Sequence, residues 1–295
     1  MNSFHSPDGS PRGAAVGSAV AGLGVVKATP AMLPALRQKP GRVGGESLPT
    51  SLLKHADDQT VAGIAAVLRA MDAGGLDATS FRDWGVVAAS RFMGRTALAG
   101  ALLKFKAEGA WGLSPHLIPH RSLHALSGTV SQALKVHGPN FGSGGGPGGA
   151  ADALLTATAL LDGGGLPGVW VVLTGWEPEP ITDERGQVIT PDCVCDAVAL
   201  ALVPPAPGCP RLSLRVVPAA TEPRRNGHAG VGQLSLEALV RALADPAGFP
   251  TALVWHLPLG GRVELERKPA SGSNGTAGRR QPGPEHVAVG AEKLS

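Results

Sequence analysis

A loop made almost entirely of glycine is the first candidate for binding chemistry in this sequence. It lies in HGPNFGSGGGPGGAADALLTA, residues 137–157, directly before an alanine- and leucine-rich segment that favours a helix. Bare backbone N–H groups and the first turn of a helix attract anions, so Ser143, Gly144, Gly145 and Gly146 could bind a phosphate, acyl or pantetheine group. The sequence places no Arg or Lys close by, so we expect anion binding by the loop alone to be weak.

The position of the loop argues against a nucleotide fold. A dinucleotide-binding domain has its glycine fingerprint in the first strand-to-helix turn, with an acidic residue about 20 positions further on. Here the glycines follow a predicted helix midway along the chain, and no GxxxxGK[ST] motif occurs. A phosphate cradle is therefore a minor hypothesis.

Four histidines near a Ser-Pro segment could serve acid–base catalysis. They are His116, His120, His124 and His137, and Asp152 could orient one of them. His120 and His124 are four residues apart and could share a helical face. No third ligand has metal-site spacing, so we expect no metal. The alternative, which we favour, is a polar rim on a packed helix, with Asp152 stabilising the first turn of the next helix through its dipole.

Other reactive side chains have structural interpretations. Glu177 and Glu179 end a predicted strand but alternate with prolines, which favours an extended surface turn, and Trp176 is expected to cover the core there. Cys193 and Cys195 are only one residue apart, which suits neither a disulfide framework nor a zinc site. We expect both to be buried strand residues.

The composition predicts one large folded domain. The chain has 295 residues, of which 43% are hydrophobic and 17% charged. Residues 1–15 and 269–295 are rich in Gly, Pro and Ser, so we expect disordered tails around a domain at 16–268. A net charge of +3 with scattered basic residues and no Tyr argues against nucleic acid. No apolar run is long enough to cross a membrane, no signal peptide is recognisable, and no cofactor motif occurs, so we expect a cytoplasmic protein without a cofactor.

Short β-branched runs alternate with helical periodicity, which is typical of an α/β fold. Strands are expected at 18–26, 84–90, 169–175, 193–204, 211–218, 251–257 and 262–267. Helices are expected at 59–75, 94–109, 120–136, 150–165 and 234–245.

Five of these elements carry specific expectations. The strands at 193–204 and 211–218 should be neighbours, and those at 251–257 and 262–267 should close the sheet as a pair, so that the sheet is mixed. The helix at 150–165 is almost wholly apolar and should be buried on most sides.

The order of the motifs resembles that of the β-ketoacyl synthases, which have a thiolase-like fold. AVAGLGVVKATP resembles their first strand and turn, GVVAAS their second strand, and SPHLIPHRSLHALSGTVSQALKVHGPNF their stretch from a Ser-Pro to a Gly-Pro. The resemblance continues through ALLDGG, VVLTGWEPE and DAVALALVP and covers residues 19–203. It implies the N-terminal half of the thiolase-like fold, a mixed β-sheet with helices on both faces.

The chain departs from this family where the nucleophile should be. In the family, a cysteine on a sharp turn opens a long buried helix, whose dipole lowers the thiol pKa so that the thiolate can take an acyl chain. Counting forward from Pro139 places the equivalent residue at Pro147, and counting back from Gly163 places it at Gly146. Neither can attack a thioester, and Ser143 should lie in the strand or before the turn.

The paired histidines of the family are also missing. Its second half supplies one in a His-Gly-Thr-Gly-Thr motif that does not occur here, and His228 in NGHAGVGQ is a weak counterpart, more simply interpreted as a surface-loop residue. The resemblance therefore implies a noncatalytic homodimer, or a heterodimer with an active ketosynthase, joined along the strand before the glycine loop. Acyl-carrier protein would be a further partner, in fatty-acid or polyketide synthesis. The alternatives are an enzyme that reuses the fold for His/Asp chemistry and a coenzyme A or phosphopantetheine-binding module.

Overall fold

The computed structural model describes residues 16–77, 79–146, 148–190, 192–205, 212–217, 235–244, 252–257 and 261–267. Its strands are β1 (Val16–Ala28), β2 (Arg42–Val43), β3 (Glu46–Ser47), β4 (Gly85–Ser90), β5 (Asn140–Gly142), β6 (Val169–Glu177), β7 (Val194–Val203), β8 (Leu212–Val217), β9 (Ala252–His256) and β10 (Arg262–Arg267). Its helices are α1 (Leu33–Gln38), α2 (Asp58–Gly74), α3 (Arg95–Glu108), α4 (Leu117–Arg121), α5 (His124–Leu134), α6 (Gly149–Asp162) and α7 (Leu236–Ala244), with the 3-10 turns η1 (Thr50–Leu52) and η2 (Gly109–Gly112). The predicted tails, 1–15 and 269–295, lie outside the described residues.

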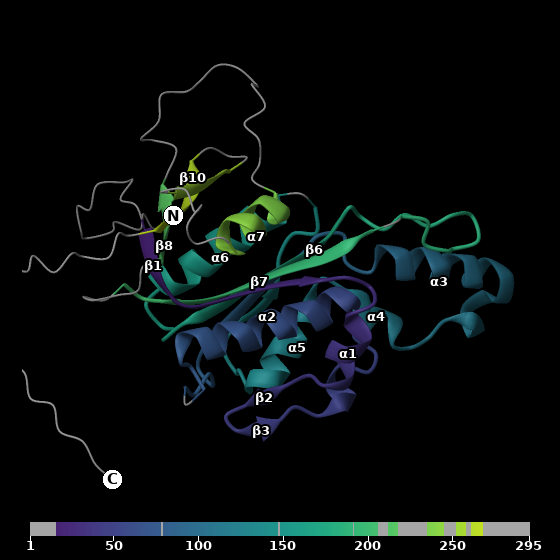
Figure 1. Cartoon of the computed structure of the whole chain (residues 1–295), viewed down its shortest axis with the longest axis horizontal. Coiled ribbons are helices and arrows are strands. Elements are labelled where there is room, and N and C mark those ends of the chain that lie inside the picture. The colour runs from purple at the N-terminus through teal and green to yellow at the C-terminus, as the bar shows by residue number, and fades with distance from the viewer. Residues whose placement is uncertain are drawn as a thin grey trace, which may run out of the picture.

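One eight-stranded mixed sheet forms the centre of the fold, in the order β5-β4-β6-β7-β1-β8-β10-β9 (Figure 1). Strands β5, β4 and β6 run parallel, and every later pair is antiparallel. The predicted closing pair, β9 and β10, is confirmed. The prediction that β7 and β8 are neighbours is wrong, because β1 lies between them. At 13 residues, β1 is long enough to pair with β7 along one stretch and with β8 along another.

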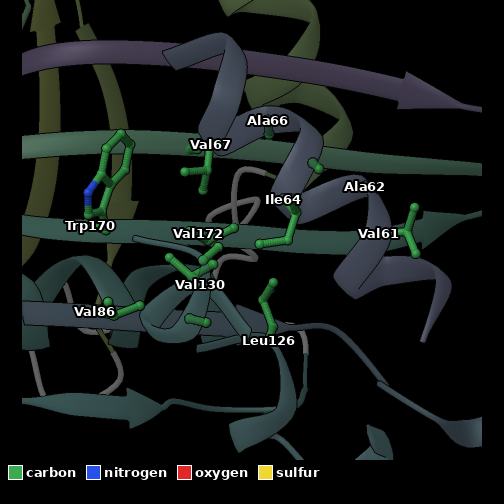
Figure 2. Close-up of a cluster of buried hydrophobic side chains, with 14 of the residues drawn as sticks. Val61, Ala62, Ile64, Ala66, Val67, Val86, Leu126, Val130, Trp170 and Val172 are labelled. Carbon is green, nitrogen blue, oxygen red and sulfur yellow. The ribbon is translucent and has the colours of Figure 1, made fainter. Parts of the chain in front are cut away.

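Helices cover both faces of the sheet, as the resemblance implies (Figure 1). On one face α2 and α5 pack against the sheet, with Ile64 and Val67 of α2 and Leu126 and Val130 of α5 gathered around Val172 of β6 and Trp170 of the same strand at one side of the cluster (Figure 2). Helices α6 and α7 contribute the core on the other face. The sheet is thus the middle layer of three.

Helix α6 is less buried than its sequence predicts. Its small and apolar residues, including Ala153, Leu154 and Ala157, lie fully buried against the sheet. Leu155 and Asp152 are exposed on the opposite side. Burial on most sides was the wrong expectation, because α6 is an outer layer with only the sheet beneath it.

Helix α2 shows how local signals and close packing combine. The Asp57 side chain caps its first turn by accepting a hydrogen bond from the Gln59 N–H at 2.9 Å, and Gly75 ends it in the left-handed conformation with φ +62°. The helix then lies directly on β1, where Gly22 and Gly24 face its backbone. A Cβ at Gly24 would collide with the Ala66 carbonyl oxygen.

The helix predicted at 120–136 is two helices. Helix α4 ends at Arg121, Ser122 is extended with ψ 160°, and α5 begins at His124. The apolar periodicity that predicted this helix begins only at Leu123, so it could not predict whether residues 120–122 belong to the same helix. His120 and His124 therefore do not share a helical face.

Helix α3, η2 and α4 form an extension that contains no buried residue, here called the arm (Figure 1). Its exposed apolar side chains include Leu102 at 70%, Trp111 at 98% and Ile118 at 71% exposure. The connection from β6 to β7 runs beside it, since Gly186 lies next to Leu103. The predicted helix at 94–109 is confirmed, but its apolar face does not reach the core.

Among the described helices, none combines the length and the apolar character that a membrane span requires.

Candidate functional site

The glycine loop joins β5 to α6 at the carboxyl ends of two parallel strands. Strand β5 pairs with β4, and the Ser143 N–H extends that ladder by donating to the Ala88 carbonyl at 2.7 Å. The Phe92 N–H donates to the Gly145 carbonyl at 2.8 Å and so attaches the loop to the end of β4. The loop is therefore held as a tight strand-to-helix turn, with Ser143 before its apex.

Close contacts exclude a side chain at Gly142 and at Gly144, but not at Gly146. A Cβ at Gly142 would collide with the Leu123 carbonyl oxygen, and one at Gly144, which has φ +60°, would lie 2.5 Å from Gly149 Cα. A Cβ at Gly146 would meet nothing within 4 Å. The fold thus leaves room for a side chain at the position where the resemblance places the nucleophile.

A pocket of about 130 Å³ opens at the N-terminus of α6. It is lined by Ala89, Ser90, Arg91, Gly145, Gly146, Gly149, Ala150, Leu173, Thr174, Ser235 and Leu236. Of the loop residues predicted to bind an acyl or pantetheine group, Gly145 and Gly146 line it, whereas Ser143 and Gly144 do not. Pro147 lies outside the described residues. No Cys or His is present among the lining residues that the structure describes.

Two hydroxyl groups of the pocket, those of Thr174 and Ser90, belong to one hydrogen-bond network, whereas Ser235 Oγ accepts a hydrogen bond from the Ala238 N–H at 3.1 Å in the first turn of α7. Thr174 Oγ1 lies 3.0 Å from Gln59 Oε1 and 2.8 Å from Ser90 Oγ. Because the amide oxygen only accepts, Thr174 donates to Gln59, and Ser90 donates to Thr174. Gln59 Nε2 in turn donates to the Arg91 carbonyl at 3.0 Å. Neither hydroxyl contacts a base in this network, so neither is activated as a nucleophile.

Arg91 lines the pocket and carries a positive charge. No Arg or Lys lies near the loop along the sequence, so this charge reaches it only through the fold. Arg91 follows β4, whose end lies beside the loop, and its Nη1 is 3.1 Å from Glu177 Oε2. Its Nε is buried without a hydrogen-bond partner in the described part of the chain. Glu179 is paired with Arg95 at 2.8 Å, so the two carboxylates neutralise separate arginines. They are not paired with each other for catalysis.

Two of the predicted histidines, His116 and His120, lie away from the glycine turn, beside His55, which was not among the candidates. The rings of His55 and His116 stack in parallel with centroids 4.6 Å apart, and His120 lies 6.0 Å from His55. His124 contacts the Ser127 hydroxyl at 3.2 Å on α5, and His137 is exposed.

Asp152 lies in the first turn of α6, on the other face of the sheet from α2. It therefore orients none of these rings. His228 lies outside the described residues.

The thiols of the described chain are buried and unreactive. Cys193 and Cys195 are both buried, as predicted, but only Cys195 lies in β7, because Cys193 directly precedes that strand. Burial raises the pKa of Cys193 and raises that of Cys195 well above its ordinary value, so little thiolate forms near neutral pH. Within the described ranges, no group of three or more His, Cys, Asp or Glu side chains is arranged to hold a metal ion.

No family model and no curated protein matches the sequence. The comparison with solved structures does find matches. The chain is similar in structure to ketosynthases. One match is an acyl-carrier protein of a type II PKS in complex with its ketosynthase, with a TM-score of 0.45, 14% identity, and 64% of this chain and 62% of that chain covered.

Two further matches are of the same class. A β-ketoacyl synthase from Burkholderia phymatum has a TM-score of 0.45 at 13% identity, with 64% of this chain and 59% of that chain covered. A ketosynthase in complex with its chain length factor from Xenorhabdus doucetiae has a TM-score of 0.46 at 15% identity, with 70% and 63% covered. The match thus spans less than two thirds of the length of each of these chains, and at these identities the likeness concerns the arrangement of helices and strands.

Proposed function

We propose that this chain is a noncatalytic ketosynthase-like protein that acts as a partner of an active ketosynthase, in the manner of a chain-length factor. The proposal rests on the motifs in residues 19–203 and on the turn before α6. It places the protein in the cytoplasm, in fatty-acid or polyketide synthesis, with an acyl-carrier protein as a further partner.

The observation that carries the proposal is the pocket at the glycine turn. Its position, at the end of two parallel strands and the start of a helix, suits a nucleophile, because the helix dipole stabilises a negative charge there. Residue 146 has the space for a side chain but is Gly, and the hydroxyls of Ser90 and Thr174 are committed to each other and to Gln59. Among the lining residues that the structure describes, none is a cysteine or a hydroxyl in contact with a base.

Two surface features support a role in association. Strand β5 is an edge of the sheet and carries Phe141 at 46% exposure, so its free backbone groups and its ring are open to another chain. The arm adds Leu102, Trp111 and Ile118, which are exposed together with Ile181 and Ile189 of the β6–β7 connection. Apolar surface of this extent is typical of a protein–protein interface.

An acyl-transfer experiment tests the noncatalytic assignment. The purified chain, incubated with an acyl-loaded carrier protein or an acyl thioester, is expected to show no mass increase by intact-mass spectrometry. A catalytic ketosynthase in a parallel reaction supplies the positive control. Acylation of this chain at any residue of the turn would contradict the proposal.

The partner role predicts a specific effect at Leu102. Leu102→Glu is expected to weaken association with a ketosynthase from the same organism about ten-fold or more, because it places a charge in the apolar contact. The free energy of unfolding should change by less than about 0.5 kcal/mol, because an exposed side chain makes few native contacts. Sedimentation velocity of the mixture and urea unfolding of the chain measure the two quantities.

Ala107→Glu is the matched control, since it adds the same charge to an exposed position about 140° further around α3. Equal weakening by both variants would show that charge alone matters and that the apolar face does not form the contact. If the wild-type chain stays monomeric with and without a ketosynthase, the partner role itself is wrong.

A further inference from the structure

A cluster of histidine and basic side chains lines a second surface pocket, of about 300 Å³. Its wall includes Arg37 from α1, Lys54 and His55 from the segment after η1, and His116 and Arg121 from the region of α4. His120 lies beside them, 5.9 Å from His116 between ring centroids. The cluster is separate from the glycine turn, and the proposed partner role does not use it.

Arg37 and Arg121 fix the backbone of the pocket wall, and their charges are balanced by carboxylates. Arg37 donates to the carbonyls of Leu53 and Ala56 at 2.6 and 2.7 Å and pairs with Asp58 at 2.7 Å. These bonds hold the backbone on both sides of His55 in one conformation.

Arg121 holds the same segment from the other side. It donates to the His55 carbonyl at 3.3 Å and lies 3.6 Å from Asp57 Oδ2. Because Asp57 and Asp58 balance the two guanidinium charges, the net positive charge of the pocket comes from other groups. Within the described residues the Lys54 ammonium group has no hydrogen-bond or ion-pair partner, so it supplies one such charge.

The imidazoles lie close enough together that protonation of His55 and of His120 is disfavoured by their neighbours. Loss of hydration, followed by His116, Lys54 and Arg37, lowers the pKa of His55. Loss of hydration, followed by His116, His55 and Arg121, lowers the pKa of His120. A bound anion would reverse this effect, because it compensates the repulsion between imidazolium rings. Proton uptake and anion binding at this pocket are therefore linked.

We propose that His55, His116 and Lys54 form a binding site for a tetrahedral oxyanion, the phosphate group of a small molecule, that fills when the histidines are protonated. The two stacked rings present N–H donors from adjacent planes, and Lys54 adds a mobile ammonium group at the rim. The fixed backbone of residues 53–58 means that the rings need little rearrangement on binding. A phosphate is dianionic or monoanionic at the relevant pH and accepts several hydrogen bonds, so it matches this donor set.

Sulfate is the probe of choice, because its charge stays constant over the pH range in which histidine titrates. Calorimetric titration of the full chain is expected to show saturable binding that is about ten-fold tighter near pH 5.5 than near pH 8. Histidine Cε1–H resonances followed by NMR should show the pKa values of His55 and His120 rising on saturation. Absence of saturable binding near pH 5.5, or an affinity independent of pH, would overturn the proposal.

Variants locate the site. His116→Gln and Lys54→Gln should each weaken sulfate binding at least about five-fold near pH 5.5, whereas His137→Gln, at an exposed histidine outside the cluster, should leave it unchanged. All three positions are exposed, so folding is expected to survive, and circular dichroism checks it. Equal effects of all three variants would overturn the assignment. Inorganic phosphate and glycerol 3-phosphate, titrated separately, then show whether the free anion or a phosphate monoester is preferred.

Discussion

Gly146→Cys is expected to create a reactive thiol with a pKa below that of an ordinary cysteine. A Cβ at residue 146 meets nothing within 4 Å, so the backbone of the turn admits a side chain there. The N-terminal end of the helix dipole and the guanidinium of Arg91, which lines the same pocket, both favour the thiolate. A decrease of about one pKa unit would raise the thiolate fraction near neutral pH roughly ten-fold.

The rate of alkylation by iodoacetamide as a function of pH measures this pKa. Gly165→Cys is the matched control, because a Cβ there also meets nothing within 4 Å but lies just beyond the opposite, carboxyl end of α6. Peptide mapping separates the new thiol from the three native cysteines, Cys193, Cys195 and Cys209, of which the first two are buried. If the two variants react at the same rate and with the same pKa, the turn does not activate a thiol, and its comparison with a ketosynthase nucleophile turn is wrong.

Gly24→Ala should reduce the free energy of unfolding by about 3 kcal/mol or prevent folding. The added Cβ would overlap the carbonyl oxygen of Ala66 and lie 2.5 Å from the Ala70 backbone nitrogen. Both atoms belong to the backbone of α2, so no side-chain rotation can relieve the contact, and either β1 or the helix must shift. Since β1 also pairs with β7 and β8, the displacement would spread through the sheet.

Gly17→Ala on the same strand provides the control. Its Cβ would lie 3.5 Å from the Leu214 carbonyl oxygen, an ordinary contact, so the change in unfolding free energy should stay within about 1 kcal/mol and is expected to be stabilising. Urea unfolding followed by tryptophan fluorescence compares the two variants. A change in unfolding free energy for Gly24→Ala as small as that for Gly17→Ala would show that α2 does not pack on β1 as closely as described.

Local sequence patterns were sufficient to predict most elements of the fold. The predicted helix at 59–75 differs from α2 by one residue at each end, because Asp57, the apolar periodicity and Gly75 all act within a few positions along the chain. The strands β6 and β7 were predicted from continuous apolar runs, which suit a sheet covered on both faces. Asp152 was likewise predicted in the first turn of the helix that follows the glycines, whereas the short strand β5 before the turn was implied only by the family resemblance.

The contacts that make the candidate sites were decided by the tertiary structure alone. Gln59 and Thr174, which are 115 residues apart, close the network under the glycine turn, and Arg91 reaches the same pocket from the end of β4. The rings of His55 and His116 stack only because the segment around His55, which Arg37 and Arg121 fix, meets the start of α4 at one surface. Periodicity and capping report on neighbours along the chain, whereas pairing order and side-chain convergence depend on which distant surfaces pack together. The sequence by itself determined most of the helices and strands and the absence of a nucleophile at residue 146. Packing decided the break between α4 and α5, where β1 lies and which charges surround each pocket.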